Sequence, residues 1–222
     1  MGVFHTDRNM KFPAPLQKGR LVKRYKRFLA DIDLNGQIIT AHCANTGSMM
    51  GVKDEGAVVW VTAANNPKRK LQYDWHIIEI GTANVCINTA SANKIVEAGI
   101  NAGLVPELGG YEALRREVKY GENSRIDILL QDETRPLCYV EVKNVTLSRS
   151  PPLAEFPDSP SARGTKHLRE LAEMARQGHR AIMFYCVNRT DCERFDLARD
   201  IDPEYGREFD KAGRGRTYQR GE

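Results

Sequence analysis

Residues 125–146 read Arg-Ile-Asp-Ile-Leu-Leu-Gln-Asp-Glu-Thr-Arg-Pro-Leu-Cys-Tyr-Val-Glu-Val-Lys-Asn-Val-Thr. Two apolar runs flank a polar segment that contains a proline, a pattern that predicts two β-strands joined by a loop. Alternate residues of a strand share a face, so we expect Glu141 and Lys143 on the same face. If the two strands pair as neighbours, Asp127 lies close to Glu141 and Lys143. Three ionic side chains on a sheet are costly to bury unless they pair or hold a metal, so this stretch predicts a functional site.

The residue types predict a specific chemistry for that site. Two converging carboxylates suit Mg²⁺ or Mn²⁺, so Asp127 and Glu141 are the expected metal ligands. A bound metal lowers the pKa of water and steadies charge on the phosphate, and Lys143 would orient that water or stabilise the transition state. This chemistry is metal-assisted phosphodiester hydrolysis. The alternative is a solvated ion pair, because Glu-x-Lys is common on half-exposed strands. The additional aspartate on the preceding apolar strand favours the metal site.

The same segments resemble a known family. Arg-Ile-Asp-Ile-Leu-Leu followed by Tyr-Val-Glu-Val-Lys-Asn-Val-Thr-Leu is similar to the signature of the sugar fermentation stimulation protein A family, and Asp…Glu-x-Lys resembles the core of the PD-(D/E)xK nuclease superfamily. The resemblance extends over about residues 10–206. Further matching segments lie at residues 27–31, 41–49, 66–71, 156–158 and 163–168.

The resemblance implies an α/β protein with a β-barrel. An OB-fold-like, nucleic-acid-binding barrel is expected over residues 1–88, and a restriction-endonuclease-like (PD-(D/E)xK) α/β domain over residues 89–222. Such nuclease cores often add a helical glutamate to the site. Glu97 is the candidate for that catalytic role, with Glu112 and Glu117 as competitors. Family chains usually begin near Met10, and they usually continue past the Asp-Pro-Glu-Tyr segment at 202–205 into a helix and another strand.

Local patterns along the first half of the chain agree with a small barrel. Short strands are predicted at residues 21–32, 37–43, 56–63 and 73–80, separated by turn-forming residues. Basic side chains on the first strand and in the turn before the last one predict contacts to nucleic acid, and Tyr73 and Trp75 follow as aromatic neighbours. The predicted contacts are Lys23, Arg24, Arg27, Lys68, Arg69 and Lys70.

The second half predicts a helix at residues 92–103, a helix or turn at 106–116, a short strand at 117–121, a helix from residue 161 or 163 to 177 and a buried strand at 180–188. Lys166 lies near the start of the second long helix, where a phosphate is favoured, and Arg125 and Arg163 are predicted phosphate contacts on the same argument. His167 is interpreted as an ordinary exposed helix residue. The tail from Gly213 alternates glycine and arginine and is expected to be mobile and without a strand.

Composition limits the class of protein. The chain has 222 residues, 41% hydrophobic and 28% charged, which suffices for one substantial core or two small ones. Five scattered cysteines without a Cys-x-x-Cys pair argue against a disulfide framework and favour a reducing cytoplasm. No apolar stretch has the length of a membrane span, so no membrane partner is expected. Both a monomer and a dimer are compatible with the sequence.

Charge is distributed unevenly. Residues 1–88 contain 12 Lys and Arg against 7 Asp and Glu, whereas residues 89–222 contain 21 against 22. A basic excess on one domain raises its encounter rate with polyanions, so DNA is the expected partner.

Three functions remain open. The first is a DNA-binding protein of low sequence specificity with a Mg²⁺-dependent phosphodiesterase site. The second is a transcriptional regulator of sugar metabolism, such as that of maltose, without catalytic activity; the absence of a recognisable helix-turn-helix argues against sequence-specific repression. The third is an RNA-binding module, because OB-folds bind either nucleic acid.

Overall fold

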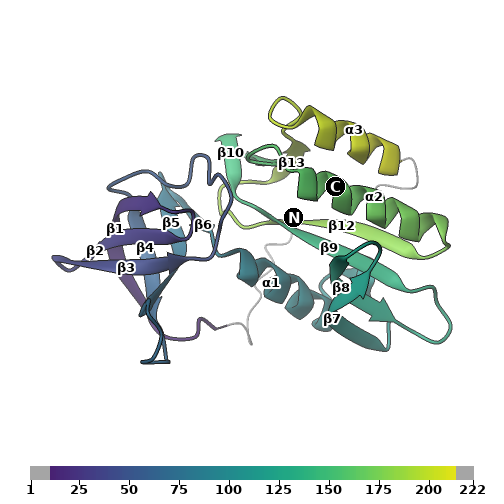
Figure 1. The fold of residues 1–222 in the computed structure, drawn as a ribbon, viewed down its shortest axis with the longest axis horizontal. Helices are drawn as coiled ribbons and strands as arrows, with labels where there is room; N and C mark the ends of the chain where they lie inside the picture. Colours follow the sequence, from purple (N-terminus) through teal and green to yellow (C-terminus); the bar gives the residue numbers. More distant parts are fainter. Residues whose placement is uncertain (1–10, 214–222) are drawn as a thin grey trace.

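The computed structural model describes residues 11–213, which form a β-barrel followed by an α/β domain (Figure 1). The expected start at Met10 and the tail 214–222 lie outside the described residues. Gly213, which is described, caps the last helix. None of the helices within residues 11–213 is both long and apolar enough to cross a bilayer.

The barrel consists of six strands in the order β3-β2-β1-β4-β5-β6, and a parallel pairing of β3 with β5 closes five of them into a ring. The OB-fold-like barrel expected from the resemblance is thereby confirmed. Trp75 lies in its core with no exposed surface, so this aromatic residue is not available to stack on a base. The strands are β1 Leu16–Tyr25, β2 Leu29–Leu34, β3 Gln37–Cys43, β4 Val58–Ala63, β5 Tyr73–Ile80 and β6 Ala83–Cys86.

The single strand predicted at residues 21–32 is wrong, because the chain reverses in a turn at residues 26–28 between β1 and β2. Lys26 and Arg27 adopt positive φ angles of 47° and 65° there. Glycine and asparagine are the usual residues in such a conformation, so the sequence carries no ordinary turn signal. Arg24 stabilises the turn instead, since its guanidinium donates to the carbonyl of Arg27 at 2.8 Å.

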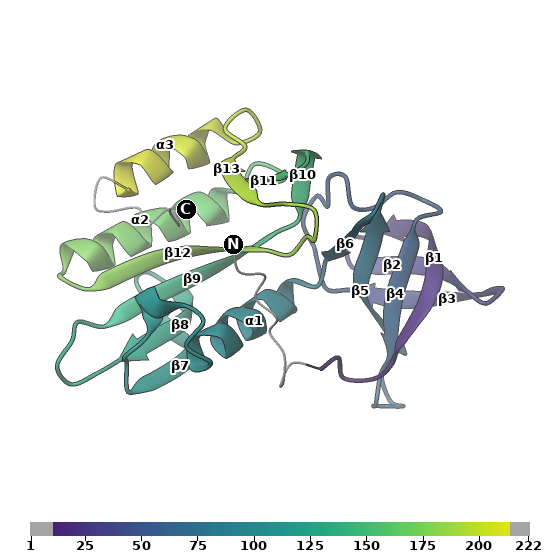
Figure 2. The same cartoon turned by 180° about the vertical axis from the view of Figure 1, so that it is seen from behind.

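The α/β domain is built on a four-stranded sheet in the order β12-β9-β8-β7, with β12 parallel to β9 and the other pairings antiparallel. Helix α1 packs its buried residues on one face and α2 on the other, and α3 lies beside α2 (Figures 1 and 2). The elements are α1 Thr89–Asn101, η1 Pro106–Leu108, β7 Ala113–Tyr120, β8 Ser124–Gln131, β9 Cys138–Val145, β10 Leu147–Ser150, β11 Leu153–Phe156, α2 Ala162–Arg176, β12 Arg180–Val187, β13 Arg194–Leu197 and α3 Pro203–Ala212.

One prediction for this half needs correction, and one sheet had no predicted counterpart. Only residues 106–108 of the predicted segment 106–116 are helical, and β7 already begins at Ala113, because Arg115 and Arg116 pair with β8 as strand residues. The second sheet, with the order β10-β11-β13, was not expected. Its strands have four residues each, which is too short for a clear alternating pattern.

The loop that follows β3 contacts the α/β domain through hydrogen bonds. The Met49 amide donates to Asp158 Oδ2 at 2.8 Å, and Thr89 Oγ1 donates to the carbonyl of Ala44, also at 2.8 Å. A backbone bridge joins Val85 to Arg189 on the other side. The contacts of Met49 and Ala44 hold the loop beside Asp158, which precedes α2, and beside the start of α1.

Candidate metal centre

A pocket of about 440 Å³ lies where the two domains meet. Its walls are the barrel loop at residues 45–47, the start of α1, the end of β9 and the first turns of α2. Four of the residues singled out in the sequence line this pocket, namely Asp127, Glu141, Lys143 and Arg163. The fold therefore brings the acidic and basic groups of two neighbouring strands and a helix into one cavity.

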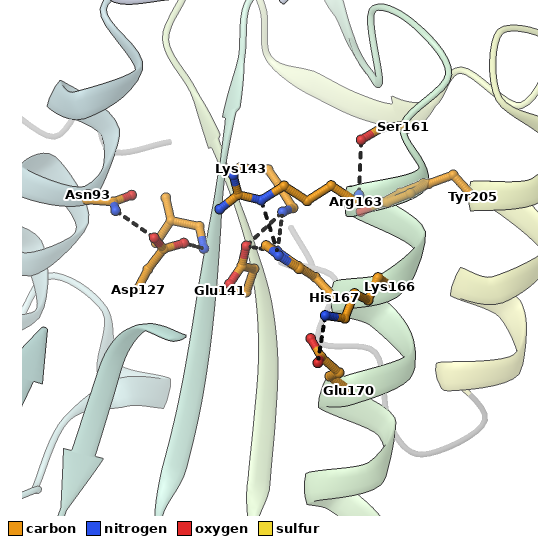
Figure 3. Close-up of polar contacts among 12 residues, drawn as sticks. Asn93, Asp127, Glu141, Lys143, Ser161, Arg163, Lys166, His167, Glu170 and Tyr205 are labelled. Carbon is orange, nitrogen blue, oxygen red and sulfur yellow. Dashed lines mark hydrogen bonds and ion pairs between the residues drawn. The ribbon is translucent and has the colours of Figure 1, made fainter. Parts of the chain in front are cut away.

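Glu141 is the most buried charged group of the site, with 3% of its surface exposed. Its Oε1 accepts a hydrogen bond from Lys143 Nζ at 2.8 Å, as expected for two residues on one strand face, and it also contacts Nδ1 of His167 on α2 (Figure 3). Arg163 Nε donates to His167 Nε2 at 3.4 Å, and Lys143 Nζ lies 3.2 Å from His167 Nδ1, so Glu141, Lys143, Arg163 and His167 form one connected group.

The second oxygen, Glu141 Oε2, is buried and has no hydrogen-bond partner within residues 11–213. Burial alone would raise the pKa of Glu141, but the hydrogen bond from His167 and the charge of Lys143 outweigh it and hold the pKa below its usual value. Glu141 is thus an ionised carboxylate with one unsatisfied oxygen, and such an oxygen is costly unless a cation occupies the space beside it.

Asp127 reaches the site because β8 and β9 separate. Their paired register ends at Ile128 and Val140, and beyond it the Val142 amide donates to Asp127 Oδ2 at 2.8 Å. Asn93 on α1 donates to the other oxygen, Oδ1, at 2.7 Å (Figure 3). Burial and then the negative charge of Glu141 raise the pKa of Asp127 above its usual value. A cation between the two carboxylates would remove this repulsion.

The donor set fits a hard divalent cation. No group of three or more His, Cys, Asp or Glu side chains with metal-binding geometry occurs in the part of the chain that the structure describes. Mg²⁺ does not need one, since it retains several waters and binds through one or two carboxylates together with substrate phosphates. Two carboxylates, one with an unsatisfied buried oxygen, meet that requirement.

The structure does not bring the candidate Glu97 to the site. This residue lies one turn beyond Asn93 on α1 and forms an ion pair with Arg116 at 3.3 Å. The competing candidates Glu112 and Glu117 are exposed on or next to β7. The helix residue that contacts Asp127 is therefore an amide and not a third carboxylate.

Two of the predicted phosphate contacts in the α/β domain lie apart from the lining of the pocket. Lys166 donates to the carbonyl of Glu122 at 2.7 Å and pairs with Glu170 at 3.6 Å. Arg125 is exposed on β8, across from Lys119 of β7. Of the three predicted contacts in this domain, only Arg163 faces the metal centre.

The basic residues of the first hairpin are largely engaged within the protein. Arg24 donates to the carbonyls of Asn45 at 3.0 Å and Gly47 at 2.9 Å, and Arg27 Nε donates to the carbonyl of Thr46 at 2.8 Å. These contacts shape the loop that walls the pocket. Lys23 forms a longer pair with Asp31 at 3.7 Å and is largely exposed.

The turn between β4 and β5 projects below the barrel in both views (Figures 1 and 2). Within it, Arg69 is bound to both oxygens of Asp74, at 2.7 and 2.8 Å. Lys68 and Lys70 are exposed. Of the three predicted contacts in this turn, the two lysines present their charge to solvent.

Two groups of the site were missed by reasoning from the sequence. His167 is 5% exposed and contacts Glu141, which corrects its interpretation as an exposed helix residue. The available signal was its position on the buried stripe of α2, three residues after Gly164 and four before Leu171. Asn93 had no comparable signal, because its contact depends on the rotation of α1 about its own axis.

Comparison with known proteins agrees with this architecture. Residues 22–87 match the family model described as the SfsA N-terminal OB domain, and residues 90–216 match the sugar fermentation stimulation protein RE domain. A sugar fermentation stimulation protein homolog of Ruegeria sp. (strain TM1040) is 56% identical over 205 residues, covering 91% of this chain and 88% of the relative. A homolog of Maricaulis maris is 53% identical over 199 residues, covering 89% and 85%.

A solved structure is also similar. SfsA of Pyrococcus furiosus in complex with Ca²⁺ superposes with a TM-score of 0.81 at 28% sequence identity, covering 92% of this chain and 87% of that one. The barrel, the α/β domain and the matches over nearly the whole length lead to one conclusion. The chain belongs to the sugar fermentation stimulation protein family.

Proposed function

We propose that this protein binds DNA with low sequence specificity and hydrolyses its phosphodiester bonds with a divalent metal held by Asp127 and Glu141. The observation that carries the proposal is the buried oxygen Glu141 Oε2, which lacks a hydrogen-bond partner in residues 11–213 and belongs to a side chain that lines the same pocket as Asp127 and Lys143. The Pyrococcus furiosus relative, which is in complex with Ca²⁺, supports a site for a hard divalent cation. Mg²⁺ and Mn²⁺ are the working ions we propose for this chain.

A bound metal would supply an acidic water and positive charge opposite the phosphate. The protein residues have separate tasks. Asn93 and the Val142 amide hold the Asp127 carboxylate, and His167 holds Glu141. Lys143 shares a strand face with Glu141, so its ammonium group orients the attacking water and balances charge on the phosphate. Catalytic groups fixed in this way need little reorganisation during the reaction.

Basic side chains on the barrel would provide the binding energy for DNA. Lys23, Lys68 and Lys70 are exposed, and each neutralises a backbone phosphate without reading a base. Such contacts fix the position of a strand without selecting its sequence. Low sequence specificity follows from this arrangement, and a cytoplasmic location fits a DNA partner.

Cleavage tests the proposal. Single-stranded DNA, duplex DNA and RNA of the same sequence are incubated with the protein, with and without Mg²⁺ or Mn²⁺. We expect metal-dependent cleavage of DNA by the wild type and its loss in Glu141→Gln and Lys143→Ala. Glu97→Gln serves as the matched control, because this carboxylate pairs with Arg116 outside the metal centre and should leave cleavage unchanged.

The second candidate is a regulator of sugar metabolism, including that of maltose, that binds DNA without cleaving it. The lack of a third acidic ligand in the described part of the chain favours it. Binding of DNA with no cleavage under any metal would support this function and contradict ours. Binding of RNA alone, without cleavage, would instead support the RNA-binding alternative.

A further inference from the structure

Asn144, which follows Lys143 on β9, has an unsatisfied donor at the pocket. The residue lines the cavity, and its Nδ2 is buried and without a hydrogen-bond partner among residues 11–213. A buried N–H group without a partner costs free energy, so a position that retains one merits an explanation. The site thus contains two unsatisfied groups of opposite kind, the acceptor Glu141 Oε2 and this donor.

A neighbouring amide sets the orientation of Asn144. Asn188, just after β12, donates from its Nδ2 to Asn144 Oδ1, and its own Oδ1 accepts a contact from Cys186 Sγ at 3.6 Å. With the Asn188 amide oxygen toward Cys186, the amide nitrogen of Asn188 faces Asn144. Asn144 Oδ1 is therefore occupied, and Nδ2 is the atom turned away from Asn188.

The charge of the pocket favours a neutral donor at this place. Four acidic side chains line it, namely Asp127, Glu141, Glu155 and Asp158, against the two basic ones Lys143 and Arg163. A phosphate is repelled by this lining until a divalent cation is bound. A metal ion together with a phosphate oxygen would satisfy both unsatisfied groups at once, the cation at Glu141 Oε2 and the anion at Asn144 Nδ2.

We propose that Asn144 is a substrate-contacting residue whose Nδ2 donates a hydrogen bond to a non-bridging oxygen of the phosphodiester, with Asn188 as its positioning residue. The inference rests on the proposed function, since it identifies the group that receives the phosphate of that same site. It assigns to the pocket an anion contact that depends on hydrogen bonding and not on charge.

Binding measured without turnover tests the assignment. A fluorescent oligothymidylate is titrated in Ca²⁺ by anisotropy, and a thymidine dinucleotide with one phosphodiester linkage is used as competitor. A hydrogen bond to a charged partner changes affinity by about tenfold or more, so Asn144→Ala should weaken binding of the dinucleotide by that factor. Asn188→Ala leaves the Asn144 amide in place but free to rotate and should cause a smaller loss. Asn84→Ala, an exposed asparagine on β6, is the matched control and should bind as the wild type does.

Methylphosphonate dinucleotides separate contact from structure. The two diastereomers each replace a different non-bridging oxygen with a methyl group. If Asn144 contacts one oxygen, Asn144→Ala weakens the native dinucleotide and one diastereomer but has no further effect on the other. An equal loss for all three ligands, or no loss for any, overturns the assignment of Asn144 alone. If the wild type binds neither the oligothymidylate nor the native dinucleotide and cleaves no nucleic acid, the proposed function is overturned, and the assignment of Asn144 with it.

Discussion

The two carboxylate oxygens of Glu141 lie in different environments. Its Oε1 contacts Lys143 and His167, whereas its Oε2 is buried and has no hydrogen-bond donor in the described chain. The first oxygen fixes the carboxylate in place, and the second keeps a lone pair available for a cation. Asp127, in contrast, uses both of its oxygens to accept hydrogen bonds from Asn93 and Val142.

Asp127 and Lys143 are expected to have different effects on metal binding, because only Asp127 offers oxygen ligands. Asp127→Ala removes a carboxylate from the metal centre and should abolish Mn²⁺ binding. Lys143→Ala removes a cation that is no ligand, so Mn²⁺ binding should persist while cleavage is lost. Calorimetric titration of the two variants with Mn²⁺ measures this difference. Wild-type affinity in both would reduce the three ionic groups to a structural ion pair.

The β1–β2 hairpin and the loop after β3 form one unit through Arg24. Its Nη2 donates to the carbonyls of Arg27, Asn45 and Gly47, all between 2.8 and 3.0 Å. Arg24, which the sequence predicts to contact nucleic acid, therefore holds the loop that forms one wall of the pocket.

Arg24→Ala should lower the free energy of unfolding by about 1–3 kcal/mol, because three carbonyls, two of them partly buried, lose a charged donor. It should also speed hydrogen exchange of the amides at residues 45–49. Lys23→Ala is the matched control, and its exposed pair with Asp31 predicts a change below about 1 kcal/mol. Unchanged exchange in Arg24→Ala would show that the loop is held by its contacts to the α/β domain alone.

The turn between β4 and β5 allows a test of electrostatic DNA binding. Replacing Lys68 and Lys70 by Ala should weaken binding to all sequences alike and reduce the slope of log affinity against log salt by about 1–2. Arg69 is left intact because its pair with Asp74 supports the turn. The charge-matched control replaces Arg176 and Lys211 on helices α2 and α3 and should leave the slope unchanged. Equal affinity and slope in the turn variant would place the DNA on another surface.

His76 of the barrel contacts Asn88 at the start of the α/β domain and so joins the two parts of the molecule. Asn88 donates to its Nδ1 at 3.2 Å and also caps α1, while Nε2 interacts with Thr62 at 2.9 Å. Both ring nitrogens are used by the neutral form, and a proton on Nδ1 would break the contact to Asn88. Burial lowers the pKa of His76 and outweighs the negative charge of Asp74, which acts to raise it.

The lowered pKa of His76 predicts how stability depends on pH. The unfolded chain has a histidine pKa of about 6.5, so it binds the proton more readily than the folded chain does. The contribution of His76 is present in full above pH 6.5 and is lost as the pH falls from there towards the lower folded pKa. Urea unfolding at pH 7.5, 6.5 and 5.5 should show this loss in the wild type and a smaller one in His76→Gln. Parallel curves for the two proteins would assign the loss to other groups.

The sequence was sufficient for features that depend on local pattern. Alternation in a strand places Glu141 and Lys143 on one face, whatever the rest of the molecule does, and the structure confirms it at 2.8 Å. Short strands between turn signals indicated the barrel, and the helical period indicated α1 and α2 to within a few residues. These features follow from backbone geometry within a few neighbouring residues.

Other features were decided only by tertiary structure. The rotation of α1 against the sheet brings Asn93 and not Glu97 to Asp127, and a helix carries no local signal for which of two residues on adjacent turns will reach its neighbour. The turn at residues 26–28 forms without glycine because Arg24 donates to the carbonyl of Arg27 and Arg27 donates to the carbonyl of Thr46 in the distant loop. His167 reaches Glu141 because α2 packs across β9. Each of these contacts joins residues that are far apart along the chain or on different elements, and only the packing of those elements sets which side chains meet.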